Sequence, residues 1–365
     1  MKILFVVKNM RLSNGVASYA MNYYRKLNGS DIQFDFLIIS DVGSPYYSEI
    51  EESGNKVFFM PSYKKEPFKI IPYLNRLFTD NKYDVVHCNV MNSGSVILKI
   101  AKIHKVPVRI LHSHATQTGD KKWKELRNKL FCAVSLKNAN TYFSCSHLAG
   151  DYLFGKDNYY LIPNAIDVDK YSYDQQKRNF LREEEYCEKK LIVTTVGRFT
   201  RQKNPIFIVD IVDELSKMGI EFTFWWFGNG ELEPEVHKYA HEKGVDKYIK
   251  FWGANPKVMD YYSAADIFIL PSLYEGLPVV GIEAQVAALP VLLADTITTE
   301  TKISDSVRFL PIASAKLWAK YIAELRDCNR ETIAKTLNLS EYKIENQAKK
   351  LKNLYSDLLM KYKLE

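Results

Sequence analysis

Short apolar runs alternate with helical patterns along the whole chain. The first run covers residues 3–7, and a helical pattern follows it over residues 16–27. Such alternation predicts strand, helix, strand crossover units and therefore a parallel, doubly wound α/β sheet. The same pattern predicts further strands at residues 34–39, 57–60, 85–88, 106–111 and 142–145 in the first half, and at 191–196, 222–227, 249–252, 267–270, 291–293 and 307–310 in the second.

The chain contains two sets of this alternation, separated by a charged, irregular stretch at residues 171–190. Its 365 residues also exceed what one hydrophobic core usually serves. We therefore predict two Rossmann-like domains, residues 1–170 and 171–339, facing each other across a cleft. Ligands of doubly wound sheets bind beyond the carboxyl ends of the strands, so the loops after strands are expected to carry the chemistry. The tail, residues 340–365, is predicted to be an amphipathic helix that packs on another part of the protein.

Composition and charge exclude several classes of protein. The five cysteines are odd in number and scattered, so we expect reduced thiols in a cytoplasmic protein and no zinc site. The net charge of +7 is modest and no nucleic-acid-binding module is recognisable, so no nucleic-acid partner is expected. The apolar run at residues 3–7 is too short for a signal peptide, and no stretch has the length of a membrane span.

Two carboxylates, Glu275 and Glu283, flank a strand, loop, helix junction in the second half, with seven residues between them. The first amide N–H groups of the predicted helix, which begins near Val279, have no partner inside the helix and attract anions. This arrangement predicts a site for a polyhydroxylated ligand that carries phosphate. The alternative is that Glu275 only caps the helix and Glu283 is a solvated surface residue.

A cationic loop follows another predicted strand of the second half. Arg198, Arg201 and Lys203 lie between that strand and a helix that starts near Pro205. Fixed cations in this place can neutralise a diphosphate leaving group, although a solvated basic loop is the simpler explanation. The sequence Gly228-Asn-Gly230 repeats the strand, glycine, helix order and would let a nucleotide lie against backbone, but alone it is a common turn.

The loops of the first half carry weaker signals. Gly15 immediately precedes a helix, where backbone could approach a ligand closely. His112 and His114 occupy positions on the same side of a strand near its carboxyl end, so one of them is expected to point into the cleft. The basic segment at residues 121–131 carries Trp123, and could lie on an anionic membrane surface or be a plain solvated helix.

Taken together, these residues resemble the retaining, nucleotide-sugar-dependent glycosyltransferases of family 4, which have the two-domain GT-B fold. The resemblance covers nearly the whole chain and is nearest to the capsular and exopolysaccharide enzymes of bacteria. The motifs that carry it are the Gly15 loop, the strand that ends in His114, the segment Ile162-Pro-Asn-Ala-Ile-Asp167, Gly197-Arg-Phe199 with Lys203, Gly228-Asn-Gly230, and Glu275-Gly-Leu-Pro278 with Glu283.

The resemblance implies roles for residues of the second half. Arg198 and Lys203 would bind the donor's diphosphate, Glu283 would bind the ribose, and Glu275 would contact the donor sugar. The other donor contacts that it implies are Gly228, Asn229 and Trp252 beside the nucleotide, and the backbone of Gly276, Leu277 and Pro278 beside the distal phosphate.

In the first half, the resemblance implies that Gly15 lets its loop close over the phosphates and that His114 contacts the sugar. His114, Arg198, Lys203 and Glu275 would then form the catalytic set. Asn14 stands where many members have a second glycine, and the C-terminal helix would return to the first domain. The residues expected on the acceptor side are Asn14, His112, Lys121, Lys122 and Trp123.

The expected reaction is transfer of a hexose or N-acetylhexosamine, from a UDP-sugar in preference, to a saccharide acceptor. The resemblance places that acceptor on a polyprenyl diphosphate at the cytoplasmic membrane face, so peripheral contact with an anionic membrane is expected. Asp167 and Asp169 imitate the metal motif of a different glycosyltransferase architecture but lie in the interdomain connection, so no metal or other cofactor is expected. The alternatives are a sugar-nucleotide epimerase or phosphorylase of the same architecture, and a non-catalytic subunit.

Overall fold

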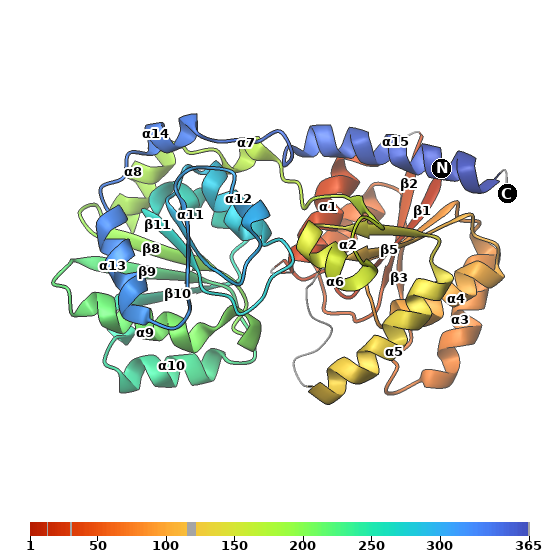
Figure 1. Ribbon diagram of the computed structural model, residues 1–365, viewed down its shortest axis with the longest axis horizontal. Coiled ribbons are helices and arrows are strands. Elements are labelled where there is room, and N and C mark those ends of the chain that lie inside the picture. Colours follow the sequence, from red (N-terminus) through yellow and green to blue (C-terminus); the bar gives the residue numbers. More distant parts are fainter. Residues whose placement is uncertain (13, 30, 115–121, 364–365) are drawn as a thin grey trace. The chain divides into compact units, whose positions relative to one another are not determined.

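The computed structural model describes residues 1–12, 14–29, 31–114 and 122–363, and the chain forms two compact units. Unit 1 comprises Met1–Ala165 and Glu341–Glu365, and unit 2 comprises Ile166–Ser340. Each unit is built on one sheet in which every strand pair is parallel (Figure 1). The predicted doubly wound α/β architecture, with one Rossmann-like sheet in each half, is confirmed.

The seven strands of unit 1 lie in the order β3-β2-β1-β4-β5-β6-β7. The chain therefore starts in the middle of the sheet and builds it outward in both directions, with the change of direction between β1 and β4. Ligands of such sheets bind near this point. The strand bounds are β1 (Lys2–Val7), β2 (Gln33–Ile38), β3 (Val57–Phe59), β4 (Val85–Cys88), β5 (Val108–Ser113), β6 (Thr141–Ser144) and β7 (Tyr160–Leu161).

Helices cover both faces of this sheet. Alternate residues of β1 point to opposite faces, so that Phe5 packs with α1 and α15, whereas Leu4 packs with α3 and α4. Strands covered on both faces are mainly apolar, as the apolar runs of the sequence indicated, although β2 also carries the buried Asp35 and β4 the buried His87. The helix bounds are α1 (Gly15–Leu27), α2 (Pro45–Glu52), α3 (Pro67–Asp80), α4 (Gly94–Ile103), α5 (Lys122–Asn138) and α6 (His147–Phe154).

Unit 2 has six strands in the order β10-β9-β8-β11-β12-β13. It too starts in the middle of its sheet, so the loops after β8 and β11 lie at its change of direction. These are the loops that carry the predicted cations and carboxylates. The strand bounds are β8 (Leu191–Val196), β9 (Phe222–Phe227), β10 (Ile249–Gly253), β11 (Ile267–Leu270), β12 (Val291–Ala294) and β13 (Val307–Leu310).

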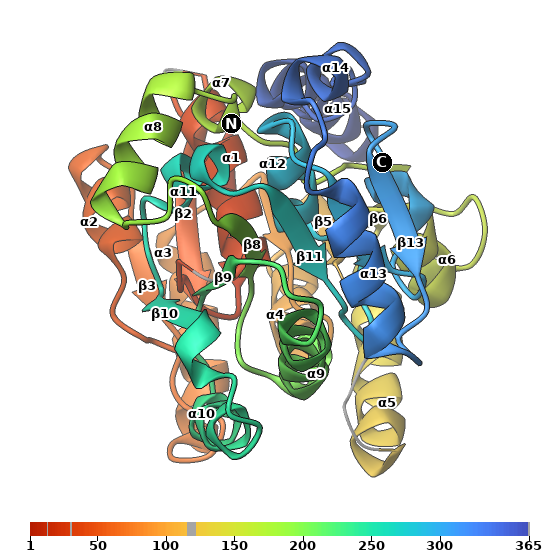
Figure 2. The same cartoon turned by 90° about the vertical axis from the view of Figure 1, so that its left-hand side faces the viewer.

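The helices of unit 2 enclose one large apolar core, within which α9 and α13 pack side by side (Figure 2). The largest fully buried side chains of this core include Trp225, Trp226 and Trp318. The helix bounds are α7 (Val168–Tyr171), α8 (Gln175–Glu184), α9 (Pro205–Ser216), α10 (Glu233–Glu242), α11 (Val258–Ala264), α12 (Val279–Val286), α13 (Ala315–Leu325) and α14 (Arg330–Lys335).

The boundary between the units lies earlier than the sequence indicated. The structure divides the chain between Ala165 and Ile166, whereas we expected the division within residues 171–190. That stretch is not irregular throughout, because it contains α8. The Asp174 side chain caps this helix by accepting hydrogen bonds from the amides of Gln176 and Lys177.

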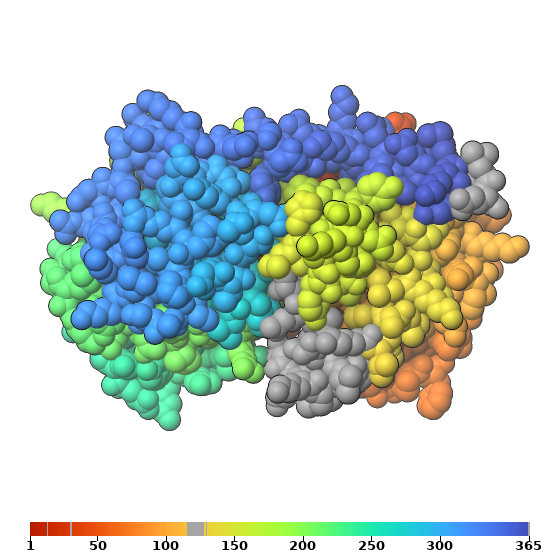
Figure 3. Space-filling model, in the orientation of Figure 1, coloured from red at the N-terminus to blue at the C-terminus, as the bar shows by residue number. Residues whose placement is uncertain are grey.

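The C-terminal helix α15 (Ile344–Lys363) packs on unit 1. Its buried residues include Leu351, Tyr355 and Leu358, which join the same core as α1. Figure 3 shows α15 in dark blue along the upper edge of unit 1. The amphipathic tail predicted from the sequence therefore covers one face of the N-terminal sheet.

Candidate active site

Two loops of unit 2 bring Lys203 and Glu275 together. Lys203 ends the short 3-10 turn Arg201–Lys203 after β8, and Glu275 lies in the turn between β11 and α12. Lys203 Nζ is 2.5 Å from Glu275 Oε1, and the two side chains are only 15% and 9% exposed. Shielding from water strengthens the attraction between these charges, so the loops are joined by a largely buried ion pair. Two of the four residues predicted to be catalytic therefore meet in unit 2.

Glu275 is not the cap of α12. The N-cap position is Pro278, and no side chain caps this helix. Instead Gln202 Nε2 donates a hydrogen bond of 3.1 Å to Glu275 Oε2. The first backbone N–H groups of any α-helix lack partners inside the helix, so the start of α12 offers a favourable place for an anion.

Glu283 is buried in α12 and is not a solvated surface residue. It is 6% exposed, and Tyr262 donates a hydrogen bond of 3.1 Å to Glu283 Oε2. Burial raises the pKa of Glu283 to about 7, and hydrogen bonds from Tyr171 and Tyr262 partly offset that rise. Glu283 therefore sits close to its titration point at neutral pH, and the simple surface explanation is excluded.

The Gly197-Arg-Phe199 loop rests directly on the Gly228-Asn-Gly230 loop. Phe199 N donates a hydrogen bond of 3.1 Å to Asn229 O. Gly228 has φ of +137°, and a Cβ atom there would lie 2.0 Å from Gly197 O; one at Gly230 would lie 2.5 Å from Phe199 O. These glycines thus permit close contact between two loops of the protein, which is a different reason from the nucleotide contact predicted for them.

Arg198 lies at this junction of loops and is half-buried. Among the described residues it makes no ion pair within the protein, unlike Lys203. Trp252 on β10 stacks on Phe227 with ring centroids 5.6 Å apart, and Lys250 Nζ lies 4.0 Å from the centroid of its ring. The Trp252 Nε1 atom is buried and has no hydrogen-bond partner. Trp252 is therefore held in an aromatic cluster, and its indole N–H donates no hydrogen bond among the described residues.

In unit 1, Asn14 and Gly15 form the start of α1. The Asn14 side chain accepts a hydrogen bond of 3.0 Å from Val16 N and donates one of 3.0 Å to Asn9 Oδ1. Asparagine caps a helix in this way, which glycine cannot do, and this gives a physical reason for Asn14. A Cβ atom at Gly15 would meet nothing within 4 Å, so no packing within the protein requires glycine there.

His112 is fully buried and belongs to a chain of hydrogen bonds inside unit 1. Its Nδ1 atom lies 2.9 Å from His87 Nε2, and His87 Nδ1 lies 2.6 Å from the Tyr355 hydroxyl on α15. Burial lowers the pKa of both histidines well below the usual value, so both are neutral near pH 7. We expected His112 on the acceptor side, but with 0% exposure it has no surface to offer an acceptor.

His114 lies just beyond β5 and stacks on His112, with ring centroids 4.0 Å apart. Its Nε2 atom is 2.8 Å from Asn89 Oδ1. Asn89 Nδ2 faces the carbonyl oxygens of Val6 and His87, so Oδ1 is the atom that faces His114 and Nε2 must carry the proton. Burial lowers the pKa of His114 to about 3, and a hydrogen bond with Asn164 opposes that shift. His114 is therefore a neutral imidazole.

The remaining acceptor-side predictions concern three residues at or just before the start of α5. Lys121 lies outside the described residues, as do the side chains of Lys122 and Trp123 at the start of α5. No helix among the described residues combines the length and the apolar character needed to cross a bilayer. The described residues also contain no cluster of three metal-binding side chains, and Asp167 pairs with Lys170 at 3.6 Å.

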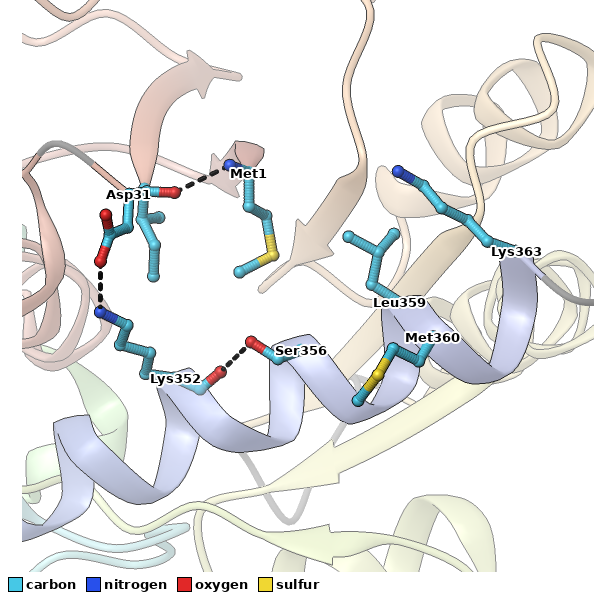
Figure 4. A pocket seen from close by; sticks show the side chains of 8 residues that line it. Met1, Asp31, Lys352, Ser356, Leu359, Met360 and Lys363 are labelled. Atoms are coloured by element: carbon cyan, nitrogen blue, oxygen red, sulfur yellow. Dashed lines mark hydrogen bonds and ion pairs between the residues drawn. The ribbon is translucent and has the colours of Figure 1, made fainter.

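Unit 1 also has a pocket beside α15, lined by four apolar and four polar or charged residues (Figure 4). Lys352 at its edge pairs with Asp31 at 3.0 Å, and Lys363 pairs with Asp84 at 3.1 Å. None of the residues predicted to bind the donor lines it. This pocket is therefore separate from the predicted donor site, whose charged residues gather in unit 2.

Two family models match the chain in sequence. The model described as Glycosyltransferase Family 4 matches residues 13–170, and the model described as Glycosyl transferases group 1 matches residues 176–350. Between them they cover most of both units. The matched ranges contain His114 in the first model and Arg198, Lys203, Glu275 and Glu283 in the second.

Curated relatives match over most of their length. A putative glycosyltransferase, EpsF of Bacillus subtilis, is 30% identical over 97% of this chain and 96% of its own. A galactosyltransferase of Escherichia coli, whose name gives UDP-galactose as its donor and GlcNAc-diphosphoundecaprenol as its acceptor, is 25% identical over 79% of this chain and 78% of its own. The chain belongs to the glycosyltransferases of family 4.

A solved structure agrees in fold. HepE of Anabaena in complex with UDP-glucose superposes with a TM-score of 0.78 and 16% sequence identity, covering 98% of this chain and 100% of HepE. With such low identity, this likeness supports the fold alone. The protein is thus a GT-B glycosyltransferase with one Rossmann-like domain in each unit.

Proposed function

We propose that this enzyme transfers a hexose or N-acetylhexosamine from a UDP-sugar to a saccharide acceptor, with retention of configuration, in the synthesis of a surface polysaccharide. The observation that carries the proposal is the set of charged groups on the loops after β8 and β11. The buried pair of Lys203 and Glu275 joins these loops, Arg198 lies on the first of them, and α12 begins beside Glu275. Cations and helix-start amides suit a diphosphate, and carboxylates suit sugar hydroxyls.

In the proposed mechanism the diphosphate leaves as positive charge develops at the anomeric carbon. Arg198 and Lys203, with the amides at the start of α12, stabilise the growing negative charge on the leaving group. Retention follows from substitution on the face of the departing phosphate, which takes the acceptor's proton. A proton NMR spectrum of the fresh product should show the donor's anomeric configuration, and the inverted anomer would contradict this mechanism.

We further propose that catalysis needs no metal, because fixed cations of the protein supply the charge that a divalent ion would supply elsewhere. Turnover should be unchanged after dialysis against EDTA. A loss of activity that magnesium restores would contradict this proposal.

The proposed acceptor is a saccharide on a polyprenyl diphosphate. Support comes from the Escherichia coli relative, whose name includes such an acceptor, and from exposed apolar side chains on α5. Leu130 and Phe131 are 68% and 45% exposed on this helix, and the sequence that precedes them is basic. A helix of this composition can lie in the interface of an anionic membrane.

Membrane contact is tested by co-sedimentation with vesicles that contain anionic lipid. Replacing both Leu130 and Phe131 with Ser should reduce the bound fraction, because exposed apolar side chains contribute to insertion. The matched control is Tyr186→Ser, which alters a residue that is 83% exposed in unit 2. Equal binding of the two variants would contradict a role for α5.

The function itself is tested with a panel of UDP-sugars and GDP-sugars, with and without a lipid-linked saccharide acceptor. The proposal predicts release of UDP that depends on the acceptor, together with a product one sugar longer. Release of an altered sugar without acceptor would indicate an epimerase, and a need for inorganic phosphate would indicate a phosphorylase. Binding of a UDP-sugar without any turnover would favour a non-catalytic subunit.

A further inference from the structure

Gln202 contacts three consecutive residues of the loop that carries Glu275. Its backbone oxygen accepts a hydrogen bond of 2.8 Å from Leu273 N. Its side-chain Nε2 donates to Tyr274 O and to Glu275 Oε2, both at 3.1 Å. The orientation of the amide follows from these partners, because both can only accept and Nε2 has two hydrogens to give. Gln202 therefore fixes both the path of the turn and one oxygen of the carboxylate.

The other oxygen of Glu275 is held differently. Oε1 lies 2.5 Å from Lys203 Nζ, the cation that the proposed function assigns to the donor's diphosphate. A diphosphate carries more negative charge than one carboxylate, so it attracts the Lys203 ammonium away from Oε1 when the donor binds. Gln202 has no charge, and its second hydrogen is already engaged by Tyr274 O. The hydrogen bond from Gln202 to Glu275 is consequently expected to persist when the donor binds.

We propose that Gln202 is a positioning residue that keeps the Glu275 carboxylate in place for the donor sugar after Lys203 has moved to the diphosphate. Oε2 keeps its hydrogen bond from Gln202, and Oε1 exchanges the Lys203 ammonium for a sugar hydroxyl. This inference rests on the proposed function and assigns separate roles to Lys203 and Gln202. Lys203 acts on every ligand with a diphosphate, whereas Gln202 acts through Glu275 and only on ligands with a sugar.

The affinities for UDP and for the UDP-sugar distinguish a positioning role of Gln202 from a merely structural one. If Gln202 only tied two loops together, its loss would disturb the whole site and weaken UDP and UDP-sugar alike. If it positions Glu275, its loss weakens the UDP-sugar and leaves UDP alone. The ratio of the two dissociation constants is therefore the informative quantity.

The experiment uses the full chain with Gln202→Met, which keeps the length of the side chain and removes both hydrogen-bond donors. Calorimetric titration should give a Kd for UDP within about twofold of the wild type. The Kd and KM for the UDP-sugar that the panel identifies should rise about tenfold, the size expected when a hydrogen bond to a charged group is lost. The control is Gln176→Met, which alters an exposed glutamine at the start of α8.

Gln202→Leu provides the second variant and is measured in the same way if Gln202→Met does not fold. It also removes both hydrogen-bond donors and adds no charge that would repel the diphosphate, so the selective loss of UDP-sugar affinity should be about as large. Unchanged UDP-sugar affinity, or an equal loss for UDP and UDP-sugar, would overturn the inference. A wild type that turns over no nucleotide-sugar would instead overturn the proposed function, so the two failures are distinguishable.

Discussion

The two units hold their polar groups in opposite ways. In unit 2 the site groups are charged and are held by one another, as in the pair of Lys203 with Glu275. In unit 1 the corresponding polar groups are neutral imidazoles packed among aromatic rings, where His114 stacks on His112. Burial lowers the pKa of these histidines, so they carry no charge near pH 7. Unit 2 is thus suited to binding a charged diphosphate, and unit 1 to offering neutral hydrogen-bonding groups.

The largest effect is expected from removing the cations of unit 2. Arg198→Ala and Lys203→Ala should each lower kcat by about two to three powers of ten, because each removes a preorganised charge beside the leaving group. Arg198→Ala is the cleaner variant, since Lys203→Ala also leaves Glu275 buried without its ion-pair partner. Turnover is measured by nucleotide release. Near-normal turnover in both variants would contradict the assignment of the leaving group's cationic partners to unit 2.

The next effect concerns Glu283 and the dependence of stability on pH. Its folded pKa of about 7 lies above the ordinary value of 4.5, so between these values the folded protein binds a proton that the unfolded protein releases. Glu283 therefore lowers the stability of the ligand-free protein as pH rises through this window, by up to about 3 kcal/mol. Urea unfolding should show that Glu283→Gln is more stable than the wild type at pH 8 and equally stable at pH 4.

A parallel loss of stability in both proteins across this window would show that Glu283 is not the titrating group. The matched control is Glu242→Gln, which changes an exposed glutamate at the end of α10. This control should follow the wild type at both pH values.

A smaller effect is expected for His114. If the neutral imidazole contacts the sugar, His114→Ala should reduce kcat/KM about tenfold, as expected for one lost neutral hydrogen bond, without changing the Kd for UDP. Because the pKa of His114 is about 3, its loss should not alter the pH profile between pH 6 and pH 8. A change in that profile would show that His114 titrates during turnover, contrary to the account of unit 1.

A comparably small effect is expected for Tyr355, whose hydroxyl forms a hydrogen bond with His87 inside unit 1. Tyr355→Phe should lower the stability by about 1 to 2 kcal/mol, because it leaves a buried imidazole nitrogen without its partner. Tyr186→Phe, at an exposed position, serves as the control in thermal unfolding. Equal stability of the two variants would show that the chain from Tyr355 to His112 adds nothing to the fold.

Much of this architecture could be predicted because its signals are local. Each buried parallel strand is an apolar run of four to six residues, and both carboxylates of unit 2 lie within one strand, loop, helix segment. Helix α8 escaped prediction because Phe180 and Leu181 are its only large apolar residues, although Asp174 before it is a good N-cap signal.

The supporting residues of the site could not be predicted, because they act across long separations in sequence. Tyr355 reaches His87 over 268 positions, and Gln202 reaches Glu275 over 73. Neither residue lies in a pattern that distinguishes it from an ordinary helix or loop residue. The close contact that requires glycine at Gly228 could not be predicted from the sequence either, because the Gly197 backbone that approaches it comes from a different loop.

The proposed function requires the charged loops of unit 2 to bind the diphosphate of a UDP-sugar. Calorimetric titration of UDP into the wild type and into an Arg198→Ala, Lys203→Ala double variant tests it most directly. We expect saturable binding of one UDP per chain in the wild type and a Kd at least a hundredfold weaker in the double variant, whose fold is verified by circular dichroism. Equal affinity in the two proteins, or no binding of UDP to the wild type, would contradict it.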